Sequence, residues 1–155
     1  MKTKITSLLF GLVFLLSACG GAAGASGGSE LQQNREKWEG QNFDHYRYTV
    51  VVTCFCIFAG AEVTYEVQDG QVVNQTVQPH PDRQVDPDEI SEYYQEYNTI
   101  EKVFDFLERA TNEADEVTVA YDPTYGFPTD ITVDWIKEAA DDEIYLTLGN
   151  FESLQ

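Results

Sequence analysis

Residues 45–58 read HYRYTVVVTCFCIF, and the alternation in this stretch decides the fold. Every second side chain from Tyr46 to Phe58 is apolar, which is the period of a strand with one face on a core. Near Cys54 the intervening side chains are apolar as well. We therefore expect a long central strand over residues 45–58.

Shorter stretches with the same period predict five more strands. Asp69 and Gly70 separate the first two of these and favour a two-residue type I′ turn, because both residue types tolerate positive φ. The pattern leaves open whether Val72 or Val73 faces inward. The expected strands cover residues 62–68, 71–78, 116–121, 129–135 and 143–148.

Capping signals predict three helices. Ser29 is placed to cap a helix over residues 30–39, and Asp86 followed by Pro87 predicts a short helix that runs to about residue 96. Asn98 is a third candidate cap. It precedes the clearest amphipathic stripe in the chain, which we expect to pack across a sheet: Ile100, Val103, Phe104, Leu107 and Ala110, with Phe106 at its edge.

The order of these elements is α-βββ-α-βββ. Runs of strands interrupted by helices are typical of an α+β fold, so we expect an antiparallel sheet of about six strands with one or two amphipathic helices packed on it. Residues 29–155 have the length of a single domain.

The N-terminus has the pattern of an export signal. Lys2 and Lys4 precede a dozen apolar residues, too few to span about 30 Å of hydrocarbon. The sequence Leu-Ser-Ala-Cys19 that follows resembles the bacterial lipobox, which implies cleavage before Cys19 and acylation of its thiol. We therefore expect a lipoprotein signal peptide over residues 1–18, and a lipidated cysteine with a flexible tether over residues 19–28.

The charge restricts the partners. Nine Lys and Arg stand against 27 Asp and Glu, a formal net charge of −18, so the phosphates of nucleic acids and anionic lipid surfaces would be repelled. We expect membrane contact through the acyl chains of Cys19 (palmitate) alone. Gly20 resembles the sorting signal for the outer membrane, if the host has two membranes. The acidic domain would stand in the periplasm or outside the cell.

Several short motifs together resemble one family. They are Trp38, Cys54-Phe55-Cys56, Asp69-Gly70, Thr99-Ile100-Glu101 with Phe104, Tyr121-Asp122, Gly126-Phe127-Pro128, Asp134 and Asp141-Asp142-Glu143. In these positions the chain resembles the uncharacterised bacterial lipoprotein family called domain of unknown function 6174. The resemblance supports the domain boundaries and the lipoprotein setting, and it implies no activity and no catalytic residue.

Cys54 and Cys56 remain as a pair once Cys19 is acylated, in an oxidising compartment. On an extended strand their Cα atoms would lie about 6.6–6.8 Å apart, the upper edge of disulfide geometry, so a bridge requires a bulge or a bend. We favour such a bridge at the end of a strand. Two buried thiols, a redox-active pair and a metal site with His45 or His80 are the alternatives.

Acidic residues gather around the last two hairpins and suggest a calcium-binding module. The alternative is structural, because Asp122 before a proline is typical of an Asx turn. No Asp-x-Asp-x-Asp-Gly loop is present. The candidate ligands are Asp122, Asp130, Asp134, Asp141, Asp142 and Glu143.

No catalytic constellation and no cofactor motif stands out, so we expect no enzyme. The sequence favours a lipid-anchored binding or scaffold domain of the cell envelope whose partner is an envelope protein. A calcium-binding module and an envelope thiol–disulfide protein are the alternatives. For the cluster of Tyr93, Tyr94 and Tyr97 we favour packing over a recognition surface.

Overall fold

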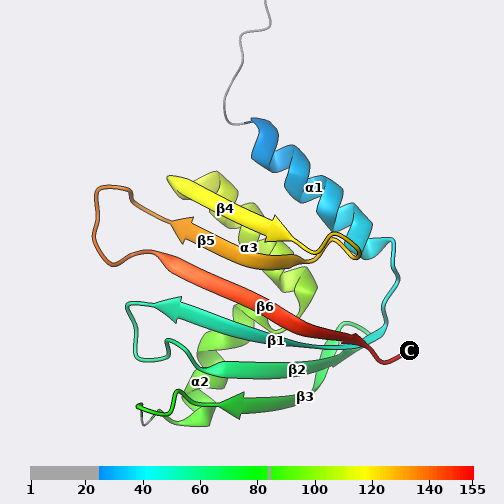
Figure 1. The fold of residues 1–155 in the computed structure, drawn as a ribbon, viewed down its shortest axis with the longest axis horizontal. Helices are drawn as coiled ribbons and strands as arrows, with labels where there is room; N and C mark the ends of the chain where they lie inside the picture. Colours follow the sequence, from blue (N-terminus) through cyan, green and yellow to red (C-terminus); the bar gives the residue numbers. More distant parts are fainter. Residues whose placement is uncertain (1–24, 84) are drawn as a thin grey trace, which may run out of the picture.

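The computed structural model describes residues 25–83 and 85–155 and contains one six-stranded antiparallel sheet (Figure 1). The α+β class is confirmed. Three helices accompany the sheet: α1 (Ala25–Glu39), α2 (Pro87–Tyr93) and α3 (Ile100–Glu113), with a 3-10 turn η1 (Tyr94–Tyr97) after α2. The strands are β1 (His45–Cys54), β2 (Glu62–Gln68), β3 (Gln71–Gln78), β4 (Glu116–Tyr121), β5 (Pro128–Asp134) and β6 (Ile144–Ser153).

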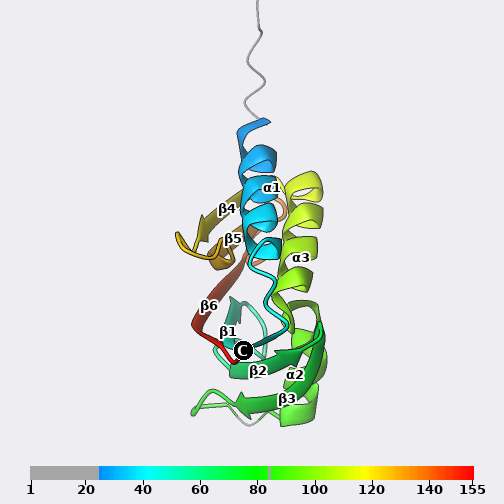
Figure 2. The same cartoon turned by 90° about the vertical axis from the view of Figure 1, so that its right-hand side faces the viewer.

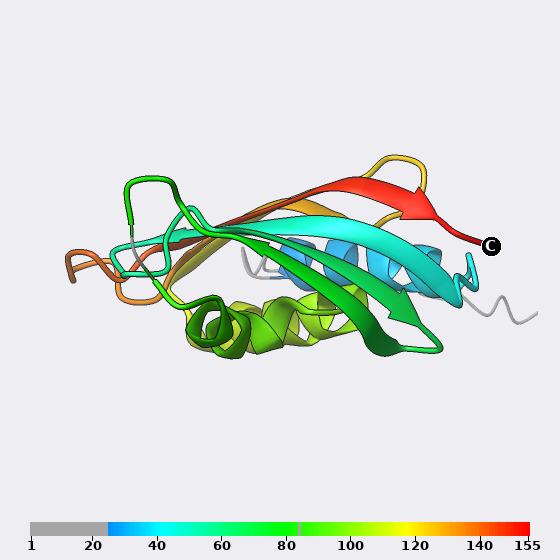
Figure 3. The ribbon, with the colours of Figure 1, turned by 90° about the horizontal axis from the view of Figure 1, so that it is seen from below.

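The strand order is β3-β2-β1-β6-β5-β4, so each half of the chain forms its own three-stranded meander. The two meanders join where β1 pairs with β6. The helices lie together on one face of the curved sheet, as Figures 2 and 3 show. Within the described ranges no helix is both long and apolar enough to cross a membrane.

The alternation read from the sequence is confirmed. The side chains of Tyr46, Tyr48, Val50 and Val52 of β1 are buried on the face of the sheet that the helices cover. The predicted apolar stripe of α3 is buried as well. Asp69 and Gly70 have φ values of 49° and 71°, as a type I′ turn requires.

The register of β3 settles which of its valines faces the core. An irregularity in the pairing of β2 with β3 lies beside Val67, which pairs with Val72. Val72 therefore packs against the core, and Val73 is 54% exposed.

Several predicted boundaries are wrong. The first strand ends at Cys54 instead of Phe58, because the chain bends sharply at residues 55–60. Helix α1 begins at Ala25 instead of Glu30, so Ser29 is not its cap and the end of the expected tether is helical. Once a helix is nucleated, each added residue gains a hydrogen bond, which allows this extension.

The third error concerns the cap of α3. Thr99 occupies the cap in place of Asn98, and its hydroxyl accepts a hydrogen bond from the backbone N–H of Lys102 at 3.2 Å. By contrast, Asp86 caps α2 as predicted and accepts from the N–H of Asp88 at 2.9 Å.

Strand β6 is longer than residues 143–148 and runs to Ser153. Its pairing with β1 shifts between Arg47 and Thr49, and nearby Asn150 has a φ of 51°. This irregularity allows pairing to resume, so that Phe151 packs against the core.

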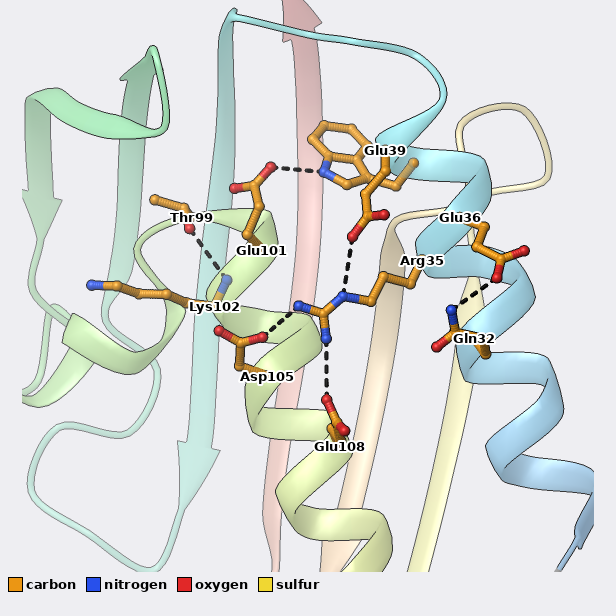
Figure 4. Close-up of polar contacts among 10 residues, drawn as sticks. Gln32, Arg35, Glu36, Glu39, Thr99, Glu101, Lys102, Asp105 and Glu108 are labelled. Carbon is orange, nitrogen blue, oxygen red and sulfur yellow. Dashed lines mark hydrogen bonds and ion pairs between the residues drawn. The ribbon is translucent and has the colours of Figure 1, made fainter.

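Polar contacts fix α1 against α3 (Figure 4). The guanidinium of Arg35 contacts the carboxylates of Glu39, Asp105 and Glu108 at 3.3, 2.5 and 3.3 Å. One turn further along α1, the indole N–H of Trp38 donates to Glu101 at 2.8 Å. These contacts join α1 to α3, although α1 itself carries few apolar residues.

Candidate functional site: the disulfide hollow

The Cys54–Cys56 pair lies at disulfide distance at the end of the central strand. The two Cα atoms are 5.2 Å apart, shorter than an extended strand allows, because β1 ends at Cys54 and Cys56 falls in the bend. The bend that the sequence required for a bridge is therefore present. A bridge across two residues closes the smallest of loops and stabilises the fold less than one across a long loop.

An open hollow of about 610 Å³ lies against this pair. The side chains of Phe55 and Ile57 are 82% and 62% exposed, and both line the hollow. Large apolar side chains so exposed beside a concavity are typical of binding surfaces. We call this site the disulfide hollow and define it by Cys54, Phe55, Cys56, Ile57, Arg83, Val85 and Glu89.

The bend is held against the linker that follows β3. Gly60 has a φ of 77°, and a Cβ there would lie 2.9 Å from the ring of His80, so the two residues are in close contact. The guanidinium of Arg83 donates to the carbonyl of Cys56 at 2.6 Å. These contacts place a positive charge beside the apolar side chains of the hollow.

The two sulfur atoms have different surroundings. Cys54 packs against the core, and its Sγ lies 3.5 Å from the hydroxyl of Tyr93. The ring of Tyr93 stacks on Phe58, with centroids 4.7 Å apart. Burial, and to a lesser degree the nearby Glu96, raises the pKa of Tyr93, so its hydroxyl keeps its proton at neutral pH.

The tyrosines after α2 serve packing, as favoured above. Tyr94 and Tyr97 are buried, and the hydroxyl of Tyr94 donates to the carbonyl of Ala61 at 2.7 Å and accepts from the N–H of Val52 at 3.0 Å. Tyr94 therefore ties the segment after α2 to β1 and to the residue that precedes β2.

The acidic candidates do not all come together. Asp122 lies in the hairpin between β4 and β5, whereas Asp141 and Asp142 lie in the connection between β5 and β6, at the opposite end of the strands (Figure 1). The oxygen of Asp122 accepts from the N–H groups of Thr124 and Tyr125 at 2.8 and 2.6 Å, which is the predicted Asx turn.

The acids near the β5–β6 connection repel one another. Partial desolvation, and then the carboxylates of Asp142, Glu143, Glu116 and Asp115, raises the pKa of Asp134. Among the residues that the structure describes, no group of three or more acidic, His or Cys side chains is arranged to hold a metal ion. His45 instead pairs with Glu66 at 2.9 Å.

The spacing of the cysteines pointed to part of this site, and the rest was missed. Arg83, Val85 and Glu89 come from the linker and from α2, and no periodicity or motif marks them. The prolines at 79 and 81 are typical of a linker, but they do not show its path back to the end of β1. Cys19, the predicted lipidation site, lies outside the described residues.

The sequence profile of a family of unknown function, DUF6174, matches residues 30–153. The chain belongs to DUF6174. The match spans the whole sheet, α2, α3 and the disulfide hollow, so the DUF6174 domain includes every residue of the candidate site. No curated protein and no solved structure matches the chain.

Proposed function

We propose that this DUF6174 chain is a lipid-anchored domain of the cell envelope that binds a polypeptide segment in the disulfide hollow. The observation that carries the proposal is the exposure of Phe55 and Ile57. The bend between two paired strands holds these side chains in water, where they gain nothing for the fold. The hollow they line is of the size that ligand sites have, about 300–1,000 Å³.

The setting rests on the N-terminal sequence. Acyl chains on Cys19 would hold the domain at a membrane, and two or three such chains anchor durably. We expect radiolabelled palmitate to label the wild-type chain and not Cys19→Ala. Equal labelling of both would exclude the anchor.

The chemistry of the hollow favours one class of partner. Its apolar side chains suit apolar residues, and Arg83 offers a positive charge on a domain that otherwise repels acidic ligands. We therefore expect the bound segment to be apolar with an acidic residue. A lipid surface is a weaker candidate, because Glu89 and the strong net negative charge oppose it.

Fluorescence anisotropy tests this binding with two labelled peptides, a leucine-rich peptide with one glutamate and a polar peptide of equal length and charge. The first should bind the full-length chain at least about tenfold more tightly, and Phe55→Ser should abolish the difference. Val73→Ser is the matched control, because Val73 is also an exposed apolar residue but lies outside the hollow. Equal binding of both peptides would refute the proposal.

A second candidate function is thiol–disulfide exchange by the Cys54–Cys56 pair. It is favoured by the position of the pair in the wall of the hollow, where a bound polypeptide would contact the sulfur atoms. A bridge buried in the core and needed only for stability would not line an open binding surface.

A further inference from the structure

The contrast between the two sulfur environments assigns them different roles. We propose that Cys56 is the sulfur attacked by an incoming thiol, that Cys54 is the leaving group, and that the substrate is a polypeptide cysteine flanked by apolar residues. This inference rests on the exchange function proposed above and specifies its direction and its substrate class.

The direction follows from access. A thiolate attacks a disulfide sulfur in line with the bond that breaks, so it approaches from behind the attacked atom. Cys54 packs against the core, and the hydroxyl of Tyr93, whose ring stacks on Phe58, lies near its Sγ. Both cysteines are half-buried and line the hollow, but Cys56 follows the strand in the bend and is not packed against the core as Cys54 is. A substrate in the hollow therefore reaches Sγ of Cys56 from outside.

Tyr93 favours Cys54 as the leaving group. Its hydroxyl lies 3.5 Å from Sγ of Cys54, and the stacking on Phe58 holds it there. A hydrogen bond from a phenol stabilises a thiolate more than a bridged sulfur, because the thiolate carries a full negative charge. A more stable thiolate is a faster leaving group.

The exchange needs only the substrate dithiol and the Cys54–Cys56 disulfide as reactants. The substrate sulfur bonds to Cys56, the bond between Cys54 and Cys56 breaks, and its electron pair stays on Cys54, which then takes up a proton. A second thiol of the same substrate next attacks the substrate sulfur and releases Cys56 as a thiol. The substrate dithiol is oxidised by two electrons to a disulfide, and the protein pair is reduced by two.

The walls of the hollow select the substrate. Phe55, Ile57 and Val85 offer apolar surface beside the attacked sulfur, which side chains next to a polypeptide cysteine would cover. Glutathione lacks such side chains. At equal thiolate concentration we expect an apolar cysteine peptide to react about tenfold faster than glutathione.

The test maps the first adduct on the full-length, oxidised chain. A reduced peptide with one cysteine between two leucines is added, the reaction is quenched in acid, free thiols are alkylated, and mass spectrometry locates the peptide. We expect it on Cys56, with Cys54 alkylated, in at least about tenfold excess. An adduct mainly on Cys54, or on both equally, overturns the assignment but leaves exchange standing. No adduct on either cysteine overturns both.

Two variants test the leaving-group role of Cys54 and the substrate class separately. Tyr93→Phe keeps the stacked ring and should slow adduct formation about threefold to tenfold, whereas Tyr145→Phe, on the exposed face of β6, should not. An unchanged rate in Tyr93→Phe contradicts the leaving-group role. Phe55→Ser should lower the ratio of the peptide rate to the glutathione rate from about ten to about one, because it removes apolar surface that only the peptide covers. Equal rates for both thiols with the wild type refute the substrate class.

Discussion

The indole N–H of Trp38 and the hydroxyl of Tyr46 donate to the two oxygens of one carboxylate, that of Glu101, at 2.8 and 2.9 Å. This carboxylate therefore joins α1, β1 and α3, three elements far apart in the sequence. The same tyrosine oxygen accepts from the N–H of Ile100 at 3.2 Å. Burial, and then the charge of Glu101, raises the pKa of Tyr46, so the hydroxyl remains a donor.

Loss of this carboxylate should be costly. We expect Glu101→Ala to lower the free energy of unfolding by about 2–3 kcal/mol, because two donors lose a charged acceptor. Urea unfolding measures the change. Glu108→Ala removes a more exposed carboxylate from the same helix and should cost less than about 1 kcal/mol. Equal costs would show that Glu101 acts only as a surface charge.

The guanidinium of Arg35 should contribute in a salt-dependent way. Its contacts with Glu39, Asp105 and Glu108 are partly exposed, so we expect Arg35→Met to cost about 1 kcal/mol at low salt. The cost should shrink at 1 M NaCl, where the Debye length falls to about 3 Å. A cost independent of salt would mean that the side chain matters through packing on Phe104, whose ring it covers at 5.8 Å.

The close contact between Gly60 and His80 predicts a non-additive pair of substitutions. Gly60→Ala should cost about 2–3 kcal/mol, from the positive φ and from the collision with the imidazole. Gly70→Ala has a similar φ of 71° but open space around it, so it should cost only about 1 kcal/mol.

Combining Gly60→Ala with His80→Ala tests the cause. The double variant should recover most of the difference between the two glycine sites, because the imidazole no longer occupies the space of the new methyl group. Strict additivity in chemical denaturation would locate the cost in the backbone alone.

The acids around Asp134 predict that removing its charge raises the melting temperature in a pH-dependent way. The pKa of Asp134 is raised in the folded state, so its ionised form opposes folding at neutral pH, and the wild type recovers stability as the pH falls through that pKa. Asp134→Asn should therefore melt at a higher temperature than the wild type at pH 7. The difference should vanish below the ordinary pKa of aspartate, about 3.9.

A matched control is Asp130→Asn, four residues earlier on the same strand. It removes the same charge and should raise the melting temperature less. If both variants behave alike across the pH series, net charge rather than the local cluster is responsible.

Reduction of the Cys54–Cys56 pair should destabilise the fold less than the loss of a bridge across a long loop would. A loop this short restricts the unfolded chain little, so the loss should be about 1.5 kcal/mol, roughly half that for a 15-residue loop. Thermal melts with and without reductant measure it. A loss above about 4 kcal/mol would assign the pair to stability and weaken the exchange function.

Local chemistry made the elements predictable. The alternation around Tyr48, the Asp69-Gly70 turn, the Asp86 cap and the stripe on α3 each act within a few residues, so the sequence displays them directly. The neighbours of β1 were not predictable in the same way. Alternation shows which face of a strand is buried, but the pairing of β1 with β6 depends on contacts about 100 residues apart.

The candidate site, too, was predictable from the sequence only where local patterns mark its residues. Two cysteines at i and i+2 are visible in any reading of the sequence, and the need for a bend follows from strand geometry. Arg83 and Val85 come to the site only because the linker folds back over Gly60, and that path depends on a contact with His80 that no local pattern encodes.

The pairing of β1 with β6 affects how the protein folds during synthesis. Strand β6 is synthesised after the other five strands of the sheet and inserts between β1 and β5 at its middle. Until it arrives, two strand edges stay open to pairing with other chains. Folding therefore finishes only after β6 has been synthesised, and a chain truncated before Ile144 should aggregate rather than fold as a smaller domain.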